Sequence, residues 1–100
     1  MVAISSNRDT VMLRASYDGE VDVLHLASGV PADVEGDDLP GGIELDYSVA
    51  DGHPCGVTII GYVRNGWDRK VTELSGIVAR HLSVDPQTVV DIVRSHAPAR

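Results

Sequence analysis

The sequence predicts an α+β domain in which a small antiparallel β-meander of about four strands is followed by two α-helices. Before residue 63, apolar residues recur at every second position in several short segments, which is typical of half-buried strands. After residue 67 the apolar spacing changes to that of an amphipathic helix. The chain has 100 residues, which fits one domain with one modest core. We therefore expect a single domain with a sheet half over residues 11–63 and a helical half over residues 68–96.

The first two strands are predicted over residues 11–17 and 21–27. In the first segment, apolar side chains such as Leu13 and Tyr17 alternate with polar ones, as expected for a strand with one buried face. Asp18 and Gly19 are residue types that favour a tight turn. The two segments therefore predict a β-hairpin whose turn lies near residues 18–20.

Residues 28–42 predict a long loop. This stretch carries four Gly and two Pro among four acidic residues, a composition that favours turns over regular structure. It is also longer than most connections between secondary-structure elements. Any role of this acidic loop in binding is left open by the sequence.

Two further strands are expected over residues 43–47 and 55–63. In the first, Ile43, Leu45 and Tyr47 should face the core, while Glu44 and Asp46 should face solvent. The second is apolar on both faces, which is typical of a strand covered on both sides. Residues 55–63 therefore predict the most buried strand of the sheet.

Two helices follow the last strand. Between residues 71 and 82, apolar residues fall at positions i, i+3, i+7 and i+11, which predicts an amphipathic helix. Asp85 followed by Pro86 is typical of an N-cap and first helical residue, so a second helix should begin there and end near residue 96. We expect the second helix to bury Val89, Ile92 and Val93.

The distribution of charge suggests the kind of partner. No Lys or Arg occurs from residue 15 to residue 63, whereas ten acidic residues do, and the whole chain has a net charge of −7. Such a field attracts basic proteins and repels nucleic acid. We therefore expect a non-enzymatic binding module that presents an acidic sheet face to a small basic protein. An alternative is a solvated surface that serves solubility alone. The candidate partner-binding residues are Asp18, Glu20, Asp22, Asp37, Asp38, Glu44 and Asp46.

A spaced pattern in the first hairpin carries a family resemblance. The pattern Tyr-Asp-x-Glu-x-Asp-x-Leu occupies residues 17–24. Together with the strand and turn residues that follow, it resembles the bacterial domain-of-unknown-function family 2283, over about residues 11–62. That family has no established activity or catalytic residues, and some members are suspected antitoxins encoded beside small toxin-like proteins. The resemblance therefore implies an antitoxin-like role.

Residues 75–94 look like a helix-turn-helix of the DNA-binding kind. Ala79 supplies the small residue that the first helix needs against the second, and Ser83 stands where the turn usually has Gly. If the second helix entered a major groove, Gln87, Thr88 and Arg94 would be the DNA-binding residues. A transcriptional regulator is thus an alternative function, and an antitoxin that represses its own promoter would combine both. The other interpretation is a helical hairpin packed on one face of the sheet.

Catalytic and metal-binding constellations are weak in this sequence. His53 and Cys55 could serve a metal-dependent enzyme, with His25 as a third ligand, but no Cys-x-x-Cys or His-x-x-x-His spacing accompanies them. Cys55 is the only cysteine and is expected to pack as a small hydrophobic side chain. We therefore expect no cofactor, no metal and no enzymatic activity.

Location and assembly are expectations from composition. The N-terminal residues do not form a signal peptide, and no apolar stretch approaches the roughly twenty residues that cross a bilayer. We therefore expect a cytoplasmic protein without membrane contact. The chain has no Phe, one Trp and three Tyr, so its core must be largely aliphatic. Because a dimer contact would bury more aliphatic surface, we expect a homodimer.

Overall fold

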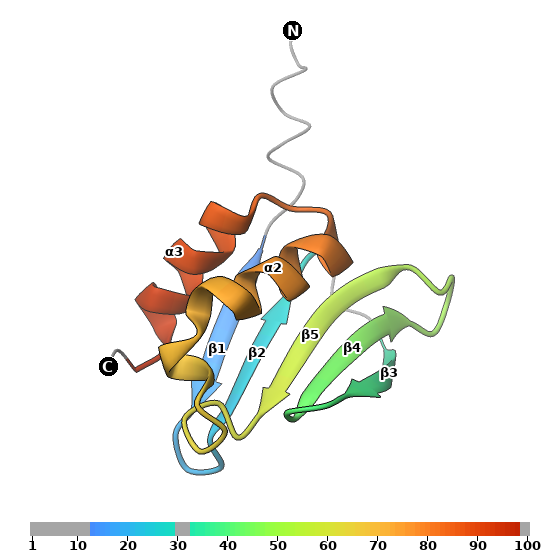
Figure 1. Cartoon of the computed structure of the whole chain (residues 1–100). Coiled ribbons are helices and arrows are strands. Elements are labelled where there is room, and N and C mark those ends of the chain that lie inside the picture. The colour runs from blue at the N-terminus through green and yellow to red at the C-terminus, as the bar shows by residue number, and fades with distance from the viewer. Residues whose placement is uncertain (1–12, 30–32, 99–100) are drawn as a thin grey trace, which may run out of the picture.

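The computed structural model describes residues 13–29 and 33–98, which form a curved five-stranded antiparallel sheet with two helices on one face (Figure 1). The α+β class with two C-terminal helices is therefore confirmed. The strands are β1 (Arg14–Asp18), β2 (Val23–Ala27), β3 (Val34–Leu39), β4 (Ile43–Ser48) and β5 (Pro54–Ile60). They are followed by a short 3-10 helix, η1 (Trp67–Arg69), and by α2 (Val71–Leu82) and α3 (Pro86–His96).

The strand order in the sheet is β1-β2-β5-β4-β3. Two hairpins, β1–β2 and β3–β4, lie on either side of β5, which pairs with β2 through Leu26 and Val57 and with β4 through Ile43 and Ile59. The expected meander is therefore wrong in its order, since consecutive strands β2 and β3 are not neighbours. The expectation that the last strand is covered on both sides is wrong, because the helices lie on one face of the sheet only and Ile60 is 46% exposed (Figure 1). β5 is central in the sheet and ends at Ile60 rather than at residue 63.

The expected loop over residues 28–42 is wrong in its second half, because residues 34–39 form the fifth strand, β3. All six residues of β3 are exposed and three of them are acidic, so no apolar alternation marks the strand in the sequence. It is held by pairing with β4, in which Leu39 lies opposite Ile43. Gly41 and Gly42 have φ angles of 87° and 82°, a conformation that glycine adopts without strain, and they make this hairpin turn.

The first hairpin differs from its prediction in the length of its turn. Asp18 lies opposite Val23, so residues 19–22 form the turn, and β2 begins two residues later than expected. The predicted start of the first strand, residues 11 and 12, lies outside the described residues. Leu13, Ala15 and Tyr17 are all half-buried, as the alternation predicts.

The core lies between the sheet and the helices. Leu24, Leu26, Val57 and Ile59 point from the sheet toward α2 and α3, and each of these side chains is fully buried. α2 packs mainly on β5 and on α3, and α3 packs on β1, so the β3–β4 hairpin extends beyond the helices (Figure 1). The turn between the helices contains Ser83 in the left-handed conformation at φ 58°. No helix within the described ranges is long and apolar enough to cross a membrane.

The second helix begins as its capping residues predict. The Asp85 carboxylate accepts a hydrogen bond from the Thr88 backbone N–H, and Pro86 is the first helical residue. Val89 and Val93 are buried as expected, while Ile92 is only half-buried. The neighbouring Val90 is buried in its place, so the apolar stripe is rotated slightly from the prediction.

The segment after β5 is tied to the first hairpin by Asp22. The Asp22 carboxylate accepts hydrogen bonds from the backbone N–H groups of Val63 and Arg64, both at 2.9 Å, and from the Tyr17 hydroxyl at 2.7 Å. Its own carbonyl accepts the N–H groups of residues 61 and 62. Asp22 was expected to bind a partner, but its carboxylate is committed to these internal bonds, and it adopts the left-handed conformation with φ 59°.

The same segment also holds the second hairpin. The Trp67 indole N–H donates to the Gly41 carbonyl at 2.7 Å, and the Asn65 amide donates to the carbonyls of Gly41 and Ile60. A side chain on Gly41 would meet the Trp67 ring. Residues 61–67 therefore form hydrogen bonds with the turns of both hairpins, at one end of the sheet.

Replacing Asp22 by Asn should lower the free energy of unfolding by about 1.5 to 3 kcal/mol, because charge-assisted hydrogen bonds are replaced by weaker neutral ones. Asn tolerates the left-handed conformation, so backbone strain does not contribute. Denaturant titration at neutral pH measures the loss. Glu20→Gln, an exposed change on the same turn, is the control and should change stability by no more than about 0.5 kcal/mol.

The loss of unfolding free energy in Asp22→Asn should depend on pH in a defined direction. Burial raises the pKa of Asp22, but the N–H groups of Val63 and Arg64 outweigh it and hold the pKa below its ordinary value. A lowered folded pKa adds stability above the unfolded pKa, and that stability is lost as pH falls through the folded pKa. The difference between wild type and Asp22→Asn should therefore shrink on acidification. A difference that stays constant with pH would contradict this role.

Candidate functional site

The predicted partner-binding acids lie at different places on the sheet rather than on one face. Asp18 and Glu20 are exposed at the first hairpin turn, where the Asp18 carboxylate accepts the Glu20 backbone N–H at 3.0 Å. Asp22 is committed to the internal bonds described above. Asp37 and Asp38 are exposed on β3, at the opposite edge of the sheet. The acidic residues therefore form two separate exposed groups, one at a turn and one on an edge strand.

The β3 edge is the more extended of the two groups. β3 pairs only with β4 among the described strands, so its outer side presents backbone N–H and C=O groups without a strand partner. Glu35, Asp37 and Asp38 give this edge three carboxylates within four residues. Because Leu39 lies opposite the buried Ile43, side chains at 35, 37 and 39 project on the face that carries the helices.

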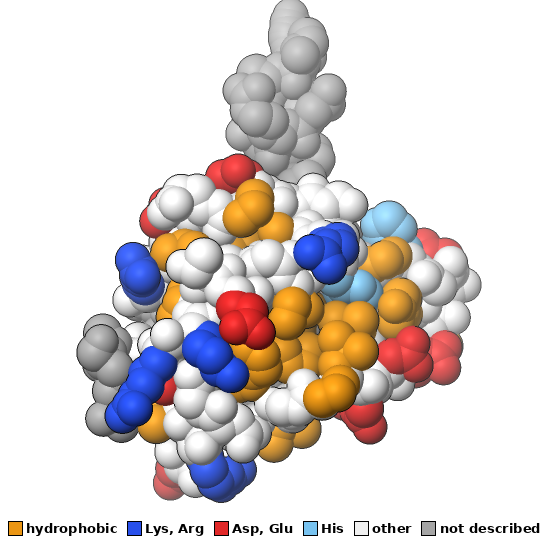
Figure 2. Space-filling view, in the orientation of Figure 1, with side chains coloured by type: hydrophobic (Ala, Val, Ile, Leu, Met, Phe, Trp, Pro, Cys, Tyr) orange, Lys and Arg blue, Asp and Glu red, His pale blue; other side chains and the backbone are white. Residues whose placement is uncertain are grey.

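A hydrophobic area lies beside this edge. On the helix side of the β3–β4 hairpin, Leu45 and Tyr47 are half-buried and Leu39 is 37% exposed, and Ile77 of α2 is also half-buried. Figure 2 shows hydrophobic side chains gathered beside α2, over β5 and β4, with acidic side chains around the outer end of the hairpin. The combination of a free strand edge, carboxylates and apolar side chains is the candidate functional site.

Tyr47 is fixed at one end of this area by α2. Its ring contacts the His81 imidazole edge to face, with centroids 5.0 Å apart. The other contact of His81 is a 3.0 Å hydrogen bond between its Nε2 and the Asp46 carbonyl. That bond requires the tautomer with hydrogen on Nε2, since a carbonyl only accepts. His81 therefore anchors the otherwise uncovered hairpin to the helical layer.

Asp46 cannot contact a partner directly, which corrects the expectation that it faces solvent. Its side chain is only 1% exposed, and its Oδ2 accepts the Thr58 hydroxyl at 2.9 Å. Asp46 lies between Gly36 on β3 and Gly56 on β5. The missing side chain of Gly56 leaves room for Asp46, while the space beside Gly36 is filled by Glu44. His25 Nδ1 lies 3.0 Å from Thr58 Oγ1. Since the Thr58 hydrogen is used on Asp46, neutral His25 must donate from Nδ1.

Glu44 and Asp46 form a carboxyl pair on one face of β4. The hydrogen bond to the Asp46 side chain is the largest cause that raises the pKa of Glu44, followed by burial and by the negative charge of Asp46. Asp46 Oδ1 is buried and accepts no hydrogen bond from the described residues. A proton held by Glu44 would supply that missing donor. Glu44 is half-buried and covers Gly36, so this pair stabilises the second hairpin more than it offers a contact surface.

The remote metal-enzyme hypothesis gains no geometric support. No three His, Cys, Asp or Glu side chains in residues 13–29 and 33–98 are grouped so that they could hold a metal ion. His53 is exposed in the turn before β5, where its N–H donates to Asp51. Burial, and then the negative charges of Asp46 and Asp51, raise the pKa of the Cys55 thiol. A raised pKa disfavours the thiolate that a nucleophilic cysteine needs.

The predicted DNA-binding residues lie on the outer face of α3. Gln87 is exposed but donates its amide to Asp91 at 3.0 Å, so a carboxylate stands beside it. Thr88 is engaged with Asp85 at the start of the helix. Arg94 is exposed near the end of α3, where it lines a pocket shared with α2. The two helices pack over the sheet as the helical-hairpin interpretation predicts.

Comparisons with known proteins add no assignment. No protein-family model, no curated protein and no solved structure matches the chain. The resemblance of residues 11–62 to family 2283 and the helix-turn-helix interpretation of residues 75–94 therefore stay predictions. The candidate site depends on the geometry alone.

Replacing Glu44 by Gln should stabilise the protein at neutral pH by about 1 kcal/mol, because the amide can donate to Asp46 Oδ1 without a titrating proton. A raised folded pKa gives stability that is full below the unfolded pKa and is lost as pH rises through the folded pKa. The gain should therefore be largest at neutral pH and should shrink on acidification. Denaturant titrations across this range measure it, with the exposed Glu35→Gln as control. A variant that is less stable than wild type at neutral pH would refute the shared proton.

Proposed function

We propose that this protein is a non-enzymatic binding module in which the β3 edge pairs with an extended segment of a small basic protein. The observation that carries the proposal is the edge itself, since all six residues of β3 are exposed and three are acidic. No Lys or Arg between residues 15 and 63 offsets those carboxylates. A basic segment is therefore the complementary partner.

Strand addition fits the hydrogen-bonding state of the edge. An incoming strand would pair with the outward N–H and C=O groups of β3, and such main-chain bonds supply affinity with little dependence on sequence. Specificity would come from the side chains of the incoming strand, which alternate between the two faces of the sheet. Those on the helix side would meet Glu35, Asp37 and the apolar area formed with Leu39 and Leu45. The expected segment therefore carries both basic and apolar residues on one face.

The carboxylates also act against an unwanted pairing. Two copies of β3 placed edge to edge would bring Glu35, Asp37 and Asp38 close to like charges, which disfavours self-association through this strand. A second copy of the chain is thus a poor occupant of the edge. The homodimer expected from composition, if it forms, must use another surface.

In the cell, binding of this kind would correspond to an antitoxin-like role. The family resemblance of the first hairpin implies it, and the acidic edge provides a physical means of neutralising a basic toxin-like protein. The group at the other turn, Asp18 and Glu20, adds negative charge at a distance and would favour the approach of such a partner more than its final contact.

Affinity capture from the native host tests the proposal with three forms of the chain. Wild type should retain a stoichiometric small basic protein at low salt and release it at high salt. The triple variant Glu35→Gln, Asp37→Asn, Asp38→Asn should lose at least tenfold in affinity. The matched control Asp18→Asn, Glu20→Gln should lose much less, because it leaves the β3 edge unchanged. Capture that is equal for all three forms, or that yields no basic protein, would reject the β3 edge as the site.

A second candidate function, DNA binding by α3, is favoured by one observation. Ser83 adopts the left-handed conformation that the turn of a helix-turn-helix requires, and α3 leaves one face exposed. If α3 reads a major groove, selection from random duplexes should yield a preferred sequence. The double variant Gln87→Ala, Arg94→Ala should weaken binding to that sequence at least tenfold. Undiminished binding by the variant would remove the groove-reading role.

A further inference from the structure

We infer that a pocket between β1 and β2, lined by Arg14, Ser16 and His25, binds the carboxylate group of a small organic acid. The pocket has a volume of about 430 Å³, and Ala15 and Ala27 complete its lining. β1 and β3 lie at opposite edges of the sheet, so this pocket is separate from the β3 edge. The site therefore goes beyond the proposed binding of a basic protein.

Strand pairing brings the polar side chains of this pocket together on the uncovered face of the sheet. Ser16 of β1 lies opposite His25 of β2, and Arg14 is two residues before Ser16, so it projects on the same side. The residues on either side of His25 are leucines that are fully buried toward the helices. Because side chains alternate along a strand, His25 projects from the other face, which no described helix covers (Figure 1).

A chain of hydrogen bonds fixes the His25 ring. The Thr58 hydroxyl donates to Asp46 at 2.9 Å, and His25 Nδ1 therefore donates to the Thr58 oxygen at 3.0 Å. Nε2 lies on the opposite edge of the ring, toward β1, and forms no hydrogen bond with the described residues. Burial of the Asp46 carboxylate costs free energy. Acceptors placed behind an imidazole in this way orient its free nitrogen toward a ligand.

Arg14 supplies positive charge beside this nitrogen. Its guanidinium donates to the Gly29 carbonyl, which leaves further N–H groups for a ligand, and no carboxylate in residues 13–29 and 33–98 forms an ion pair with it. Burial, and then the charge of Arg14, lower the pKa of His25, whereas the charge of Glu44 on β4 raises it. His25 is therefore neutral at neutral pH while no anion accompanies Arg14.

A carboxylate would complete this arrangement. One of its oxygens would accept a hydrogen bond from Arg14 and the other from His25 Nε2, with the Ser16 hydroxyl as a third donor. The bound negative charge would offset the charge of Arg14, so the pKa of His25 would rise and the ring would take up a proton. The two alanines of the pocket suit contact with the organic part of the acid.

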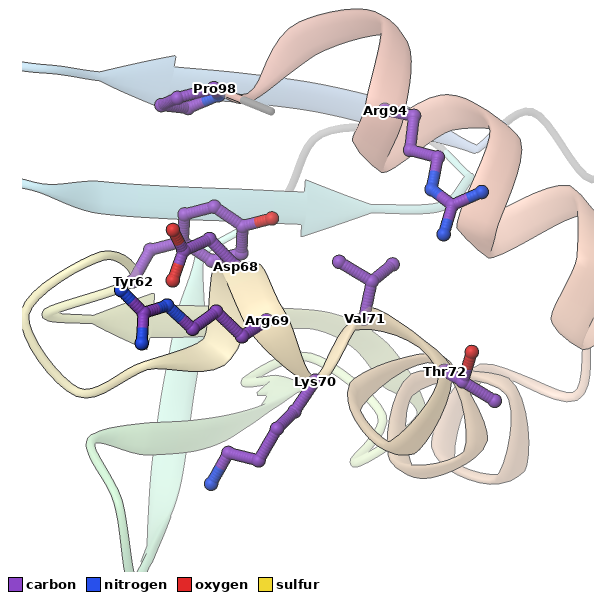
Figure 3. Close-up of a pocket in the computed structure, with 8 residues that line it drawn as sticks. All are labelled: Tyr62, Asp68, Arg69, Lys70, Val71, Thr72, Arg94 and Pro98. Carbon is purple, nitrogen blue, oxygen red and sulfur yellow. The ribbon is translucent and has the colours of Figure 1, made fainter. Parts of the chain in front are cut away.

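The larger pocket between η1, α2 and α3 lacks this convergence of groups. Figure 3 shows Arg69 and Lys70 extending away from Arg94. Asp68, which is buried, adds a carboxylate to the wall of that pocket. The pocket between β1 and β2 is therefore the better site for an anion.

Titration of the isotope-labelled full chain with benzoate, at constant ionic strength and near neutral pH, tests the site. Benzoate should shift the ring signals of His25 saturably, with a dissociation constant on the order of 1 mM. Benzamide, which has nearly the same shape without the charge, and sodium chloride should not. The ring signals of the exposed His53 should stay unchanged. Shifts that do not saturate, or that benzamide or chloride reproduces, would overturn the proposal.

Proton uptake separates this site from general attraction of an anion to Arg14. Benzoate binding should tighten by up to about tenfold per pH unit as pH falls toward the pKa of free His25, because the bound form holds its proton to higher pH. Calorimetry in two buffers of different ionisation enthalpy should show that protons are taken up. In His25→Gln both effects should disappear. Binding to the wild type that does not change with pH would overturn the proposal.

Matched arginine variants test the positive group. Arg14→Gln should weaken benzoate binding at least tenfold, because it removes the charge and keeps an amide donor. Arg80→Gln, the same change at an exposed position of α2 on the other side of the sheet, should leave binding unchanged. Equal effects of the two variants would overturn the proposal.

Discussion

The architecture depends on the hydrogen bonds that residues 61–67 make with the turns of both hairpins. The Asp22 carbonyl and carboxylate accept hydrogen bonds from the backbone N–H groups of residues 61–64, at the start of this segment. The Gly41 carbonyl accepts a hydrogen bond from the indole of Trp67, at its end. Because α2 begins four residues after Trp67, the position of the helical layer on the sheet follows from these bonds.

Much of the fold could be predicted from local pattern, because the features involved are local in the sequence. The change from period two to period 3.6 and the Asp85-Pro86 pair place both helices correctly. β3 escaped prediction because a fully exposed edge strand has no apolar periodicity, and the turn glycines Gly41 and Gly42 were the only signal for it. The strand order could not be predicted from local pattern, since the pairing of β2 with β5 joins residues 29 to 37 positions apart.

The structural roles of the acidic residues were harder to predict for a related reason. Asp46 looks like a solvent-facing strand residue until the register places it between two glycines on neighbouring strands. Asp22 looks like one more surface acid until the segment after β5 folds back onto it. Asp37 and Asp38 of β3 were named from composition, because their exposure does not depend on a distant partner, whereas Glu35 of the same strand was not named.

The central position of β5 has a consequence for how the chain acquires its structure. Each hairpin forms from neighbouring residues, but a two-stranded hairpin alone is at best marginally stable in water. The two can join only when β5, the last of the described strands, enters between them and the helices pack on the completed sheet. During synthesis the segment from β1 to α3 must therefore emerge before a cooperative core exists, and folding must wait for non-local strand pairing that is slow by its topology.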